Sequence, residues 1–368
     1  MISRTSLAAC LALLGTAAAA QTAPFALNDT GSQRCVGRDG TWAATCAGSG
    51  QDGAYGRDVA YPKDADGHAG FQYVKLDDAG KPLPRSAKTW RCVADRVTGL
   101  VWENKTDDGG PSDKDRNYTN WGDGRPGDTS VAVQDANTHA LCGATGWRLP
   151  SILEMQGLID YGQAEGANVD PAWFPNTRDW WYWAGTTYAT DPNAAWAVYY
   201  SATAGGDGAA NRDFKLSARL VRSAAGEIEA GPRYTFAGDE VTDTYTQLIW
   251  KRCAAGQSWT GSTCDGKVAI RQWPEALVYA KREAERTGQA WRLPNTKELS
   301  TTADRTQKGP AIDLSVFPNV LAHQWYWTAT PLASDPSYAW TMDFEGGYTQ
   351  SYPGRGYDLG IRLVRNAP

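Results

Sequence analysis

The strongest constraint in the sequence is an internal duplication with a period of about 144 residues. Trp147-Arg148-Leu149-Pro150 recurs as Trp291-Arg292-Leu293-Pro294 at an offset of 144. Further matches follow in the same order with a drift of one residue: Glu154 with Glu298, Asp160 with Asp304, Phe174-Pro175-Asn176 with Phe317-Pro318-Asn319, Trp181-Tyr182-Trp183 with Trp325-Tyr326-Trp327, Trp196 with Trp340, and Arg219-Leu220-Val221-Arg222 with Arg362-Leu363-Val364-Arg365. A period of this length indicates a duplicated domain rather than a solenoid repeat.

The duplication fixes the expected domain limits. Upstream of the tryptophan motif, the segment that ends at Trp102 parallels the segment that ends at Trp250. The predicted parts are a leader at 21–89, a first domain at 90–223, a linker at 224–237 and a second domain at 238–368. The leader is too short for a large core of its own, so we expect it to pack on the first domain.

Residues 1–20 have the three parts of a secretory signal peptide. Arg4 is their only charge, the apolar stretch Leu7–Leu14 follows, and small residues end at Ala20. The apolar stretch is too short to cross a bilayer, and we expect cleavage after Ala20. Cys10 ends a string that resembles a lipobox, but it precedes the end of the apolar stretch, so lipidation is the lesser alternative. The mature protein is predicted to have no membrane span and to be periplasmic or extracellular, including the cell surface.

Six cysteines follow the signal peptide, and an even number in an exported chain predicts disulfides. Two pairs have a separation of eleven residues, follow an Arg, and enclose Gly and Trp as a turn-bearing loop does. The predicted bridges are Cys35–Cys46, Cys253–Cys264 and, from the remaining two, Cys92–Cys142. Zinc binding is the competing interpretation, but the sequence has no Cys-x-x-Cys pair and only three histidines.

The local patterns predict two helices and a small antiparallel sheet in each copy, which is an α+β fold. The first helix is expected at 130–141 and at 274–288, where Pro274 suits the first turn and Gly288 the end. The second begins at a capping box, formed by Ser151 with Glu154 and by Asn295 with Glu298. Aromatic strands are expected to complete a meander at 181–187, 195–200 and 217–222, and again at 325–330, 338–344 and 360–364.

Residues that recur in both copies are expected to hold the fold together. We expect eight of the 17 tryptophans in the core: Trp102, Trp147, Trp183, Trp196, Trp250, Trp291, Trp327 and Trp340. Arg148 and Arg292 are expected to pair with a carboxylate or with backbone carbonyls inside their own copy. Asp160 and Asp304 are likewise interpreted as structural.

The ordered motifs resemble those of the Lcl C-terminal domain family, which is named after a collagen-like bacterial adhesin. The resemblance rests on Thr-Gly-Leu-x-Trp at 98–102, Trp-Arg-Leu-Pro-x-x-x-Glu at 147–154, Trp-Tyr-Trp at 181–183, Ala-Trp at 195–196 and Arg-Leu-Val-Arg at 219–222, with their counterparts in the second copy. It implies a fold similar to C-type lectins and to the formylglycine-generating enzyme domain. It also implies an extracellular or periplasmic protein that binds a ligand, with glycans as the best-known kind.

Charge narrows the choice of ligand. The formal net charge is −5, so long-range attraction to nucleic acid is not expected, and no nucleic-acid-binding motif is present. The chain lacks the Gly-X-Y stretch of the name-giving adhesin. A sulfated polysaccharide calls for clustered Lys and Arg, so the acidic balance argues against sulfated ligands.

The candidate ligand-binding residues lie where the two copies differ. The segment between the Trp196 or Trp340 strand and the last strand differs between the copies, and we expect it to form a hairpin. A shared scaffold with variable loops is typical of binding proteins. The candidates are Asp207, Asn211, Arg212 and Phe214 in the first copy, and Tyr348, Tyr352, Arg355, Tyr357 and Asp358 in the second.

Signatures of catalysis are lacking. The sequence has no Gly-x-Ser-x-Gly elbow, P-loop or His-Glu-x-x-His motif. Acidic clusters at 107–108 and 113–115 could bind Ca²⁺, although neither has EF-hand spacing. We expect no cofactor and no metal ligands.

The leading hypothesis is a non-catalytic binding protein for a carbohydrate or another envelope or surface ligand. The alternatives are an assembly module that binds envelope proteins and, third, an enzyme. The sequence leaves the oligomeric state open.

Overall fold

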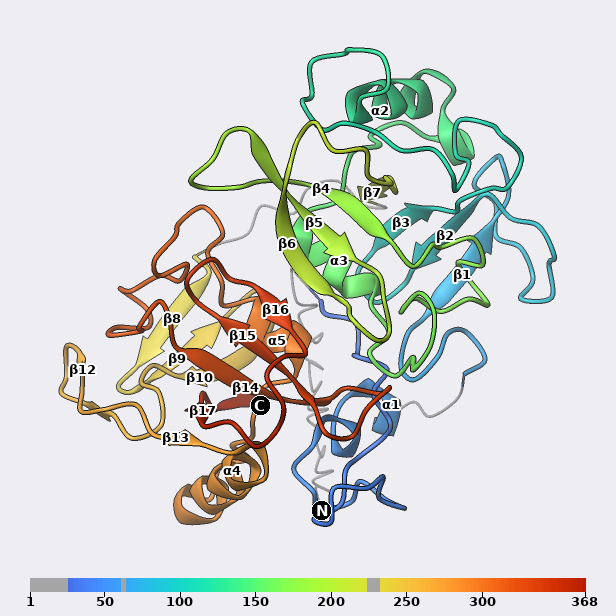
Figure 1. Ribbon diagram of the computed structural model, residues 1–368. Coiled ribbons are helices and arrows are strands. Elements are labelled where there is room, and N and C mark those ends of the chain that lie inside the picture. Colours follow the sequence, from blue (N-terminus) through green and yellow to red (C-terminus); the bar gives the residue numbers. More distant parts are fainter. Residues whose placement is uncertain (1–25, 61–63, 224–231) are drawn as a thin grey trace, which may run out of the picture.

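A computed structural model describes residues 26–60, 64–223 and 232–368 (Figure 1). The predicted signal peptide and residues 224–231 of the predicted linker lie outside these residues. The two copies lie side by side, the first cyan to yellow-green and the second yellow to red (Figure 1). Each contributes short helices and antiparallel strands, so the expected α+β class is confirmed.

Each copy has a small four-stranded sheet of the same design. The strands of the first are β1 (Tyr73–Leu76), β2 (Cys92–Asp95), β3 (Leu100–Glu103) and β7 (Val221–Ser223), in that order across the sheet. Those of the second are β8 (Tyr234–Ala237), β9 (Glu240–Asp243), β10 (Leu248–Lys251) and β18 (Val364–Asn366). β1 falls in the predicted leader and β8 in the predicted linker. The structural unit therefore begins with a strand that the repeat comparison did not detect.

The two helices that follow the Arg-Leu-Pro motif start where their capping residues predict, whereas the helix expected at 130–141 already ends at Thr138. The bounds are α1 (Arg57–Ala60), α2 (Thr129–Thr138), α3 (Ile152–Leu158), α4 (Trp273–Thr287) and α5 (Thr296–Ser300), with short 3-10 turns at Asp52–Ala54 and Leu141–Gly143. Both capping boxes are formed, and α4 ends at Gly288 with a left-handed φ of 67°. Arg148 and Arg292 each pair with the capping glutamate of their own copy at 2.6 Å, as expected.

One eight-stranded sheet runs through both copies. Its strands, in order across the sheet, are β13 (Ile270–Arg271), β17 (Leu359–Gly360), β14 (Trp325–Pro331), β15 (Ala339–Asp343), β16 (Thr349–Gln350), β6 (Gly206–Asn211), β5 (Ala194–Tyr199) and β4 (Trp181–Thr187). The two copies join where Gln350 of β16 pairs with Gly206 of β6. A separate two-stranded ribbon, β11 (Ser258–Trp259) with β12 (Cys264–Asp265), lies in the second copy.

The predicted meander is wrong in its third strand. The segment that ends in Arg-Leu-Val-Arg leaves the meander, and Val221 and Val364 pair with Trp102 and Trp250 in the small sheets. The third strand is instead the divergent hairpin strand, β6 or β16. Val221 packs in the core that contains Trp102, and Leu220 packs in the core that contains Trp147, so burial of this segment favours the small sheet over the meander.

The recurring tryptophans and the three disulfides confirm the framework prediction. All eight tryptophans are at most 3% exposed. The bridges are Cys35–Cys46, Cys92–Cys142 and Cys253–Cys264, with Cα atoms 5.3, 6.4 and 5.5 Å apart. Three disulfides are compatible with an exported protein. Within the ranges given above, none of the helices has the length and apolar character needed to cross a membrane.

The leader packs on both copies, so the expectation that it packs on the first alone is incomplete. Its Thr30 carbonyl accepts from the backbone N–H of Tyr161 in the first copy, at 2.6 Å. Val36 joins the core of the second copy around Trp273. The buried Asp52 carboxylate accepts from the hydroxyls of Thr30, at 2.8 Å, and Thr330 of the second copy, at 2.6 Å.

The buried Asp52 predicts a pH effect on stability. Burial, reinforced by the charge of Asp29, raises the pKa of Asp52 from its ordinary value of 3.8 to about 7. The folded state therefore holds this proton more tightly than the unfolded chain, and stability is lost as pH rises through the interval between the two values. Urea unfolding should show the wild type losing stability relative to Asp52→Asn between pH 4 and pH 7. Asp39→Asn, which changes an exposed leader carboxylate, should show no such trend; an equal trend in both variants would contradict the assignment.

Candidate ligand-binding site

Asp207 does not face solvent; it lies in the contact between the two copies. Its side chain is buried, accepts the backbone N–H of Thr349 at 2.7 Å and the side-chain amide of Gln156, and pairs with Arg305 at 3.4 Å. Burial raises the pKa of Asp207 to about 6, despite the opposing attraction of Arg305. Thr349 and Arg305 belong to the second copy, so this predicted ligand residue joins the two domains instead.

Tyr348 crosses the same contact from the other side. Its ring packs on Trp196 of the first copy, with centroids 4.9 Å apart, and its hydroxyl lies 2.7 Å from that of Tyr188. Its side chain is half-buried. The side chains of Tyr348 and Asp207 therefore contact the neighbouring domain and are not available to a ligand.

The other first-copy candidates lie at the far end of β6. The Arg212 guanidinium donates to the carbonyls of Pro192 and Asn120, and the Asn211 side chain accepts from the backbone N–H of Asp213 at 2.9 Å. These contacts fix the turn, whereas the ring of Phe214 is 59% exposed. Of this group, only the aromatic ring is free to meet a large ligand.

The other second-copy candidates lie on one loop, at 352–358, which contacts the start of α4 through Arg355. Tyr352 and Tyr357 are exposed, as is Asp358. The Arg355 guanidinium lies over the ring of Trp273, 5.2 Å from its centroid, and the Arg355 carbonyl accepts the backbone N–H of Trp273 at 3.0 Å. The loop is therefore anchored on the helix while its tyrosines point outward.

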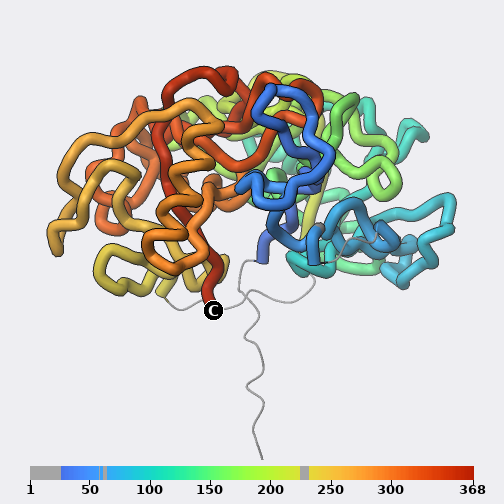
Figure 2. Tube along the Cα trace, turned by 90° about the horizontal axis from the view of Figure 1, so that it is seen from below, coloured from blue at the N-terminus to red at the C-terminus, as the bar shows by residue number. Residues whose placement is uncertain are grey.

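A groove opens between this loop, α4 and the Cys35–Cys46 loop of the leader. Its volume is about 710 Å³. Figures 1 and 2 show the leader, in blue, beside α4, in orange. One carboxylate, Glu275, lines the groove together with five cationic side chains: Arg38, Arg271, Lys281, Arg282 and Arg355. We call this the basic groove.

The cations of the basic groove are not neutralised by nearby carboxylates. Among the described residues, none of the five has an ion-pair partner within 4.0 Å. Arg38, Arg271 and Arg282 are exposed, while burial lowers the pKa of Arg355. With five cations and one carboxylate, this concave surface concentrates a positive field, even on a protein of net charge −5.

The comparison with known families agrees with the duplication. The sequence model described as the Lcl C-terminal domain matches residues 91–222 and 239–365. The chain belongs to this family. No curated protein matches it.

Comparing the sequences of the two copies predicts only one of the five cations of the basic groove. Arg355 was selected because the two Lcl domains diverge there, whereas Arg38 comes from the leader, which precedes the first Lcl match. Lys281 and Arg282 of α4 and Arg271 of β13 were missed because exposed cations on helices and strands are common. Only the placement of the leader against α4 brings these residues together.

The acidic clusters of the first Lcl domain bond mainly within their own loop. Asp113 accepts the backbone N–H groups of Asp108 and Gly109 at 2.8 and 2.7 Å, and Lys114 pairs with Asp107 and Asp115. Across the described ranges, no group of three His, Cys, Asp or Glu side chains is placed to hold a metal ion. Asp160 is buried and pairs with His68 of the leader at 2.9 Å, whereas Asp304 accepts from Thr306 in its own loop.

The interdomain role of Asp207 predicts a large loss of stability when it is removed. Asp207→Ala would leave Arg305 buried without its carboxylate, and breaking a buried pair costs about 3–5 kcal/mol. Asp213→Ala, at an exposed position of the same hairpin, removes one hydrogen bond from the Trp121 indole and should cost only about 0.5–1.5 kcal/mol. Urea unfolding of the two variants measures both. Similar small losses would show that Asp207 does not hold the Lcl domains together.

Proposed function

We propose that this protein is a non-catalytic, exported binding protein that holds an acidic glycan in the basic groove. The observation that carries the proposal is the set of five cationic side chains with no ion-pair partner among the described residues. The carboxylate, sulfate or phosphate groups of an acidic polymer would supply the missing anions. Such pairs are stronger than neutral hydrogen bonds, and Arg favours them because its fork matches planar oxygen pairs.

The shape and surroundings of the groove favour a polymer over a small ion. A volume of about 710 Å³ exceeds that of a single anion, and the cations come from the leader, β13, α4 and the 352–358 loop. Tyr352 and Tyr357 stand exposed on that loop. Aromatic faces suit the C–H faces of sugar rings, which makes the acidic ligand a carbohydrate in this proposal.

Local charge revises the argument against sulfated ligands. The net charge of −5 describes the whole chain, but ligand contact depends on charges within about 8–10 Å at physiological ionic strength. The basic groove is positive at that range. Sulfate therefore stands beside carboxylate and phosphate as a source of the anion. The expected likeness to C-type lectins and a periplasmic or surface location remain part of the proposal.

Binding measured on the mature full-length chain tests the proposal. The probes are polygalacturonate, dextran sulfate, polyphosphate and neutral dextran, measured by biolayer interferometry. The Arg38→Gln/Arg282→Gln variant removes two charge-assisted contacts of about 1.5–3 kcal/mol each, so at least one acidic polymer should bind about tenfold more weakly or worse. Both arginines are exposed, so folding should not change.

Two controls make the outcome decisive. Arg286→Gln changes an exposed cation of α4 that is already paired with Glu283 at 2.6 Å, and it should leave binding unchanged. Tyr352→Ala/Tyr357→Ala should weaken binding of the acidic glycans but not of polyphosphate, which has no sugar ring. Equal binding of neutral dextran and the acidic polymers, or no loss in the double arginine variant, would refute the proposal. Binding of polyphosphate alone would reject the carbohydrate.

A further inference from the structure

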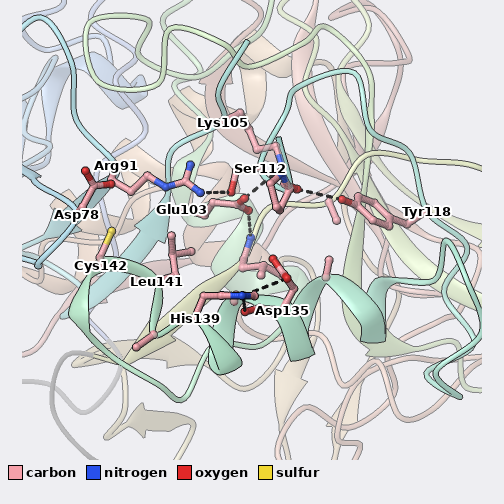
Figure 3. Close-up of a pocket in the computed structure, with 16 residues that line it drawn as sticks. Asp78, Arg91, Glu103, Lys105, Ser112, Tyr118, Asp135, His139, Leu141 and Cys142 are labelled. Atoms are coloured by element: carbon pink, nitrogen blue, oxygen red, sulfur yellow. Dashed lines mark hydrogen bonds and ion pairs between the residues drawn. The ribbon is translucent and has the colours of Figure 1, made fainter. Parts of the chain in front are cut away.

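A second cavity, separate from the basic groove, lies beneath α2 in the first Lcl domain (Figure 3). Its volume is about 300 Å³, the lower end of the range for small-molecule sites. One wall comes from α2 and the turn that carries Cys142, and the facing wall from β3 and the segment that follows it. The Cys92–Cys142 disulfide ties these walls together.

The floor of the cavity carries a buried ion pair with spare donors. Glu103 and Lys105 are each only 3% exposed, and their charged atoms lie 3.3 Å apart. The second Glu103 oxygen accepts the backbone N–H of Leu220 at 2.9 Å. Lys105 has three N–H donors but only this long contact among the described residues. Burial lowers the pKa of Lys105, although the charge of Glu103 opposes this shift.

Two further donors face the same space. Arg91 donates to the hydroxyl of Ser112 at 2.8 Å, which leaves other guanidinium N–H groups without an acceptor in the described part of the chain. The Ser112 hydroxyl accepts that bond and keeps its own proton to donate. Figure 3 shows Arg91, Ser112 and Lys105 around one side of the cavity. A carboxylate placed there would meet an ammonium, a guanidinium and a hydroxyl, while two carboxylates of the protein, Glu103 beside Lys105 and Asp78 beside Arg91, line the same cavity.

The opposite side is acidic and partly apolar. Asp135 of α2 pairs with His139 through one oxygen at 3.1 Å, and its other oxygen accepts no hydrogen bond from the residues described. The surface between the two polar sides is formed by Ala132, Ala136, Leu141 and Leu220. An anionic group, an aliphatic side chain and an ammonium group could therefore each contact a matching wall.

The second Lcl domain supplies an internal comparison. α4 starts 144 residues after α2, and a cavity of about 460 Å³ lies beside it, with Glu283 where the first copy has His139 and Lys251 where it has Glu103. There the lining charges neutralise one another: Lys251 pairs with Asp239 at 2.8 Å, and Arg286 with Glu283 at 2.6 Å. Only the first-copy cavity combines buried donors short of acceptors with a separate carboxylate.

We infer that the cavity beneath α2 binds a small zwitterion of the amino-acid class with an aliphatic side chain. The carboxylate contacts Lys105, Arg91 and Ser112, the ammonium contacts Asp135, and the side chain packs on the alanine and leucine wall. This inference is independent of the proposed glycan site, because the two share no residue.

Isothermal titration calorimetry of the full-length mature chain with three related probes tests the inference. The probes are L-leucine, 4-methylpentanoate, which lacks the ammonium, and 3-methylbutylamine, which lacks the carboxylate. Leucine should bind with a stoichiometry of one, and each analogue should bind about tenfold more weakly or worse, since each loses a charge-assisted contact. No heat with millimolar leucine, or equal affinity for 4-methylpentanoate, would overturn the assignment.

Variants locate the binding event. Asp135→Asn should weaken leucine binding about tenfold while leaving binding of 4-methylpentanoate unchanged, and Arg91→Gln should weaken both. Both side chains are partly exposed, which spares the buried Glu103–Lys105 pair, and near-ultraviolet circular dichroism checks folding. Glu283→Gln, at the matching place in the second copy, should bind leucine like the wild type. Loss of binding in Glu283→Gln but not in Asp135→Asn would place the ligand in the wrong domain and overturn the inference.

Discussion

The pairing of β6 with β16 is the contact on which the arrangement of the molecule depends. Through it, two three-stranded meanders become parts of one eight-stranded sheet, and the two edges meet where Gln350 pairs with Gly206. The same contact brings α3 and α5 together and leaves the leader to fill the remaining space between the copies. The leader packs on both copies and also contacts α4, and the basic groove forms between the leader and this helix.

The two copies are related at this contact by an approximate two-fold rotation axis. That symmetry explains why the two hairpins differ. Asp207 pairs with Val198 of β5, and Thr349 pairs with Met342 of β15, the equivalent strand of the second copy. Asp207 and Thr349 therefore occupy equivalent positions. The Thr349 backbone N–H donates to the Asp207 carboxylate. Gln156 and Ser300 are also equivalent and form a buried hydrogen bond. Two identical aspartates at such a contact would repel each other in a low-dielectric interior. Some of the divergence that suggests ligand recognition is therefore complementarity between the copies.

Features governed by nearby residues could be predicted from the sequence. Ser151 and Asn295 satisfy helix N–H groups within one turn, the Cys35–Cys46 and Cys253–Cys264 loops close over eleven residues, and the recurrent tryptophans mark the core. The third strand of the meander could not, because β6 is rich in Gly and Ala and lacks an apolar alternation. The basic groove joins residues as distant as Arg38 and Arg355, whose proximity depends on the packing of the leader.

The leader also breaks the equivalence that duplication would otherwise give. Its Cys35–Cys46 loop lies against α4, where Val36 packs near Trp273 and Gly50 lies near Leu277, and so it builds a groove on the second copy. A later part of the leader, around Gly80, instead contacts the Cys142 turn beside α2. Because the two helices meet different leader segments and carry different charges, the surfaces around them differ in shape and in charge. Repetition therefore supplies a common scaffold, and the single-copy leader gives the two helices different surroundings.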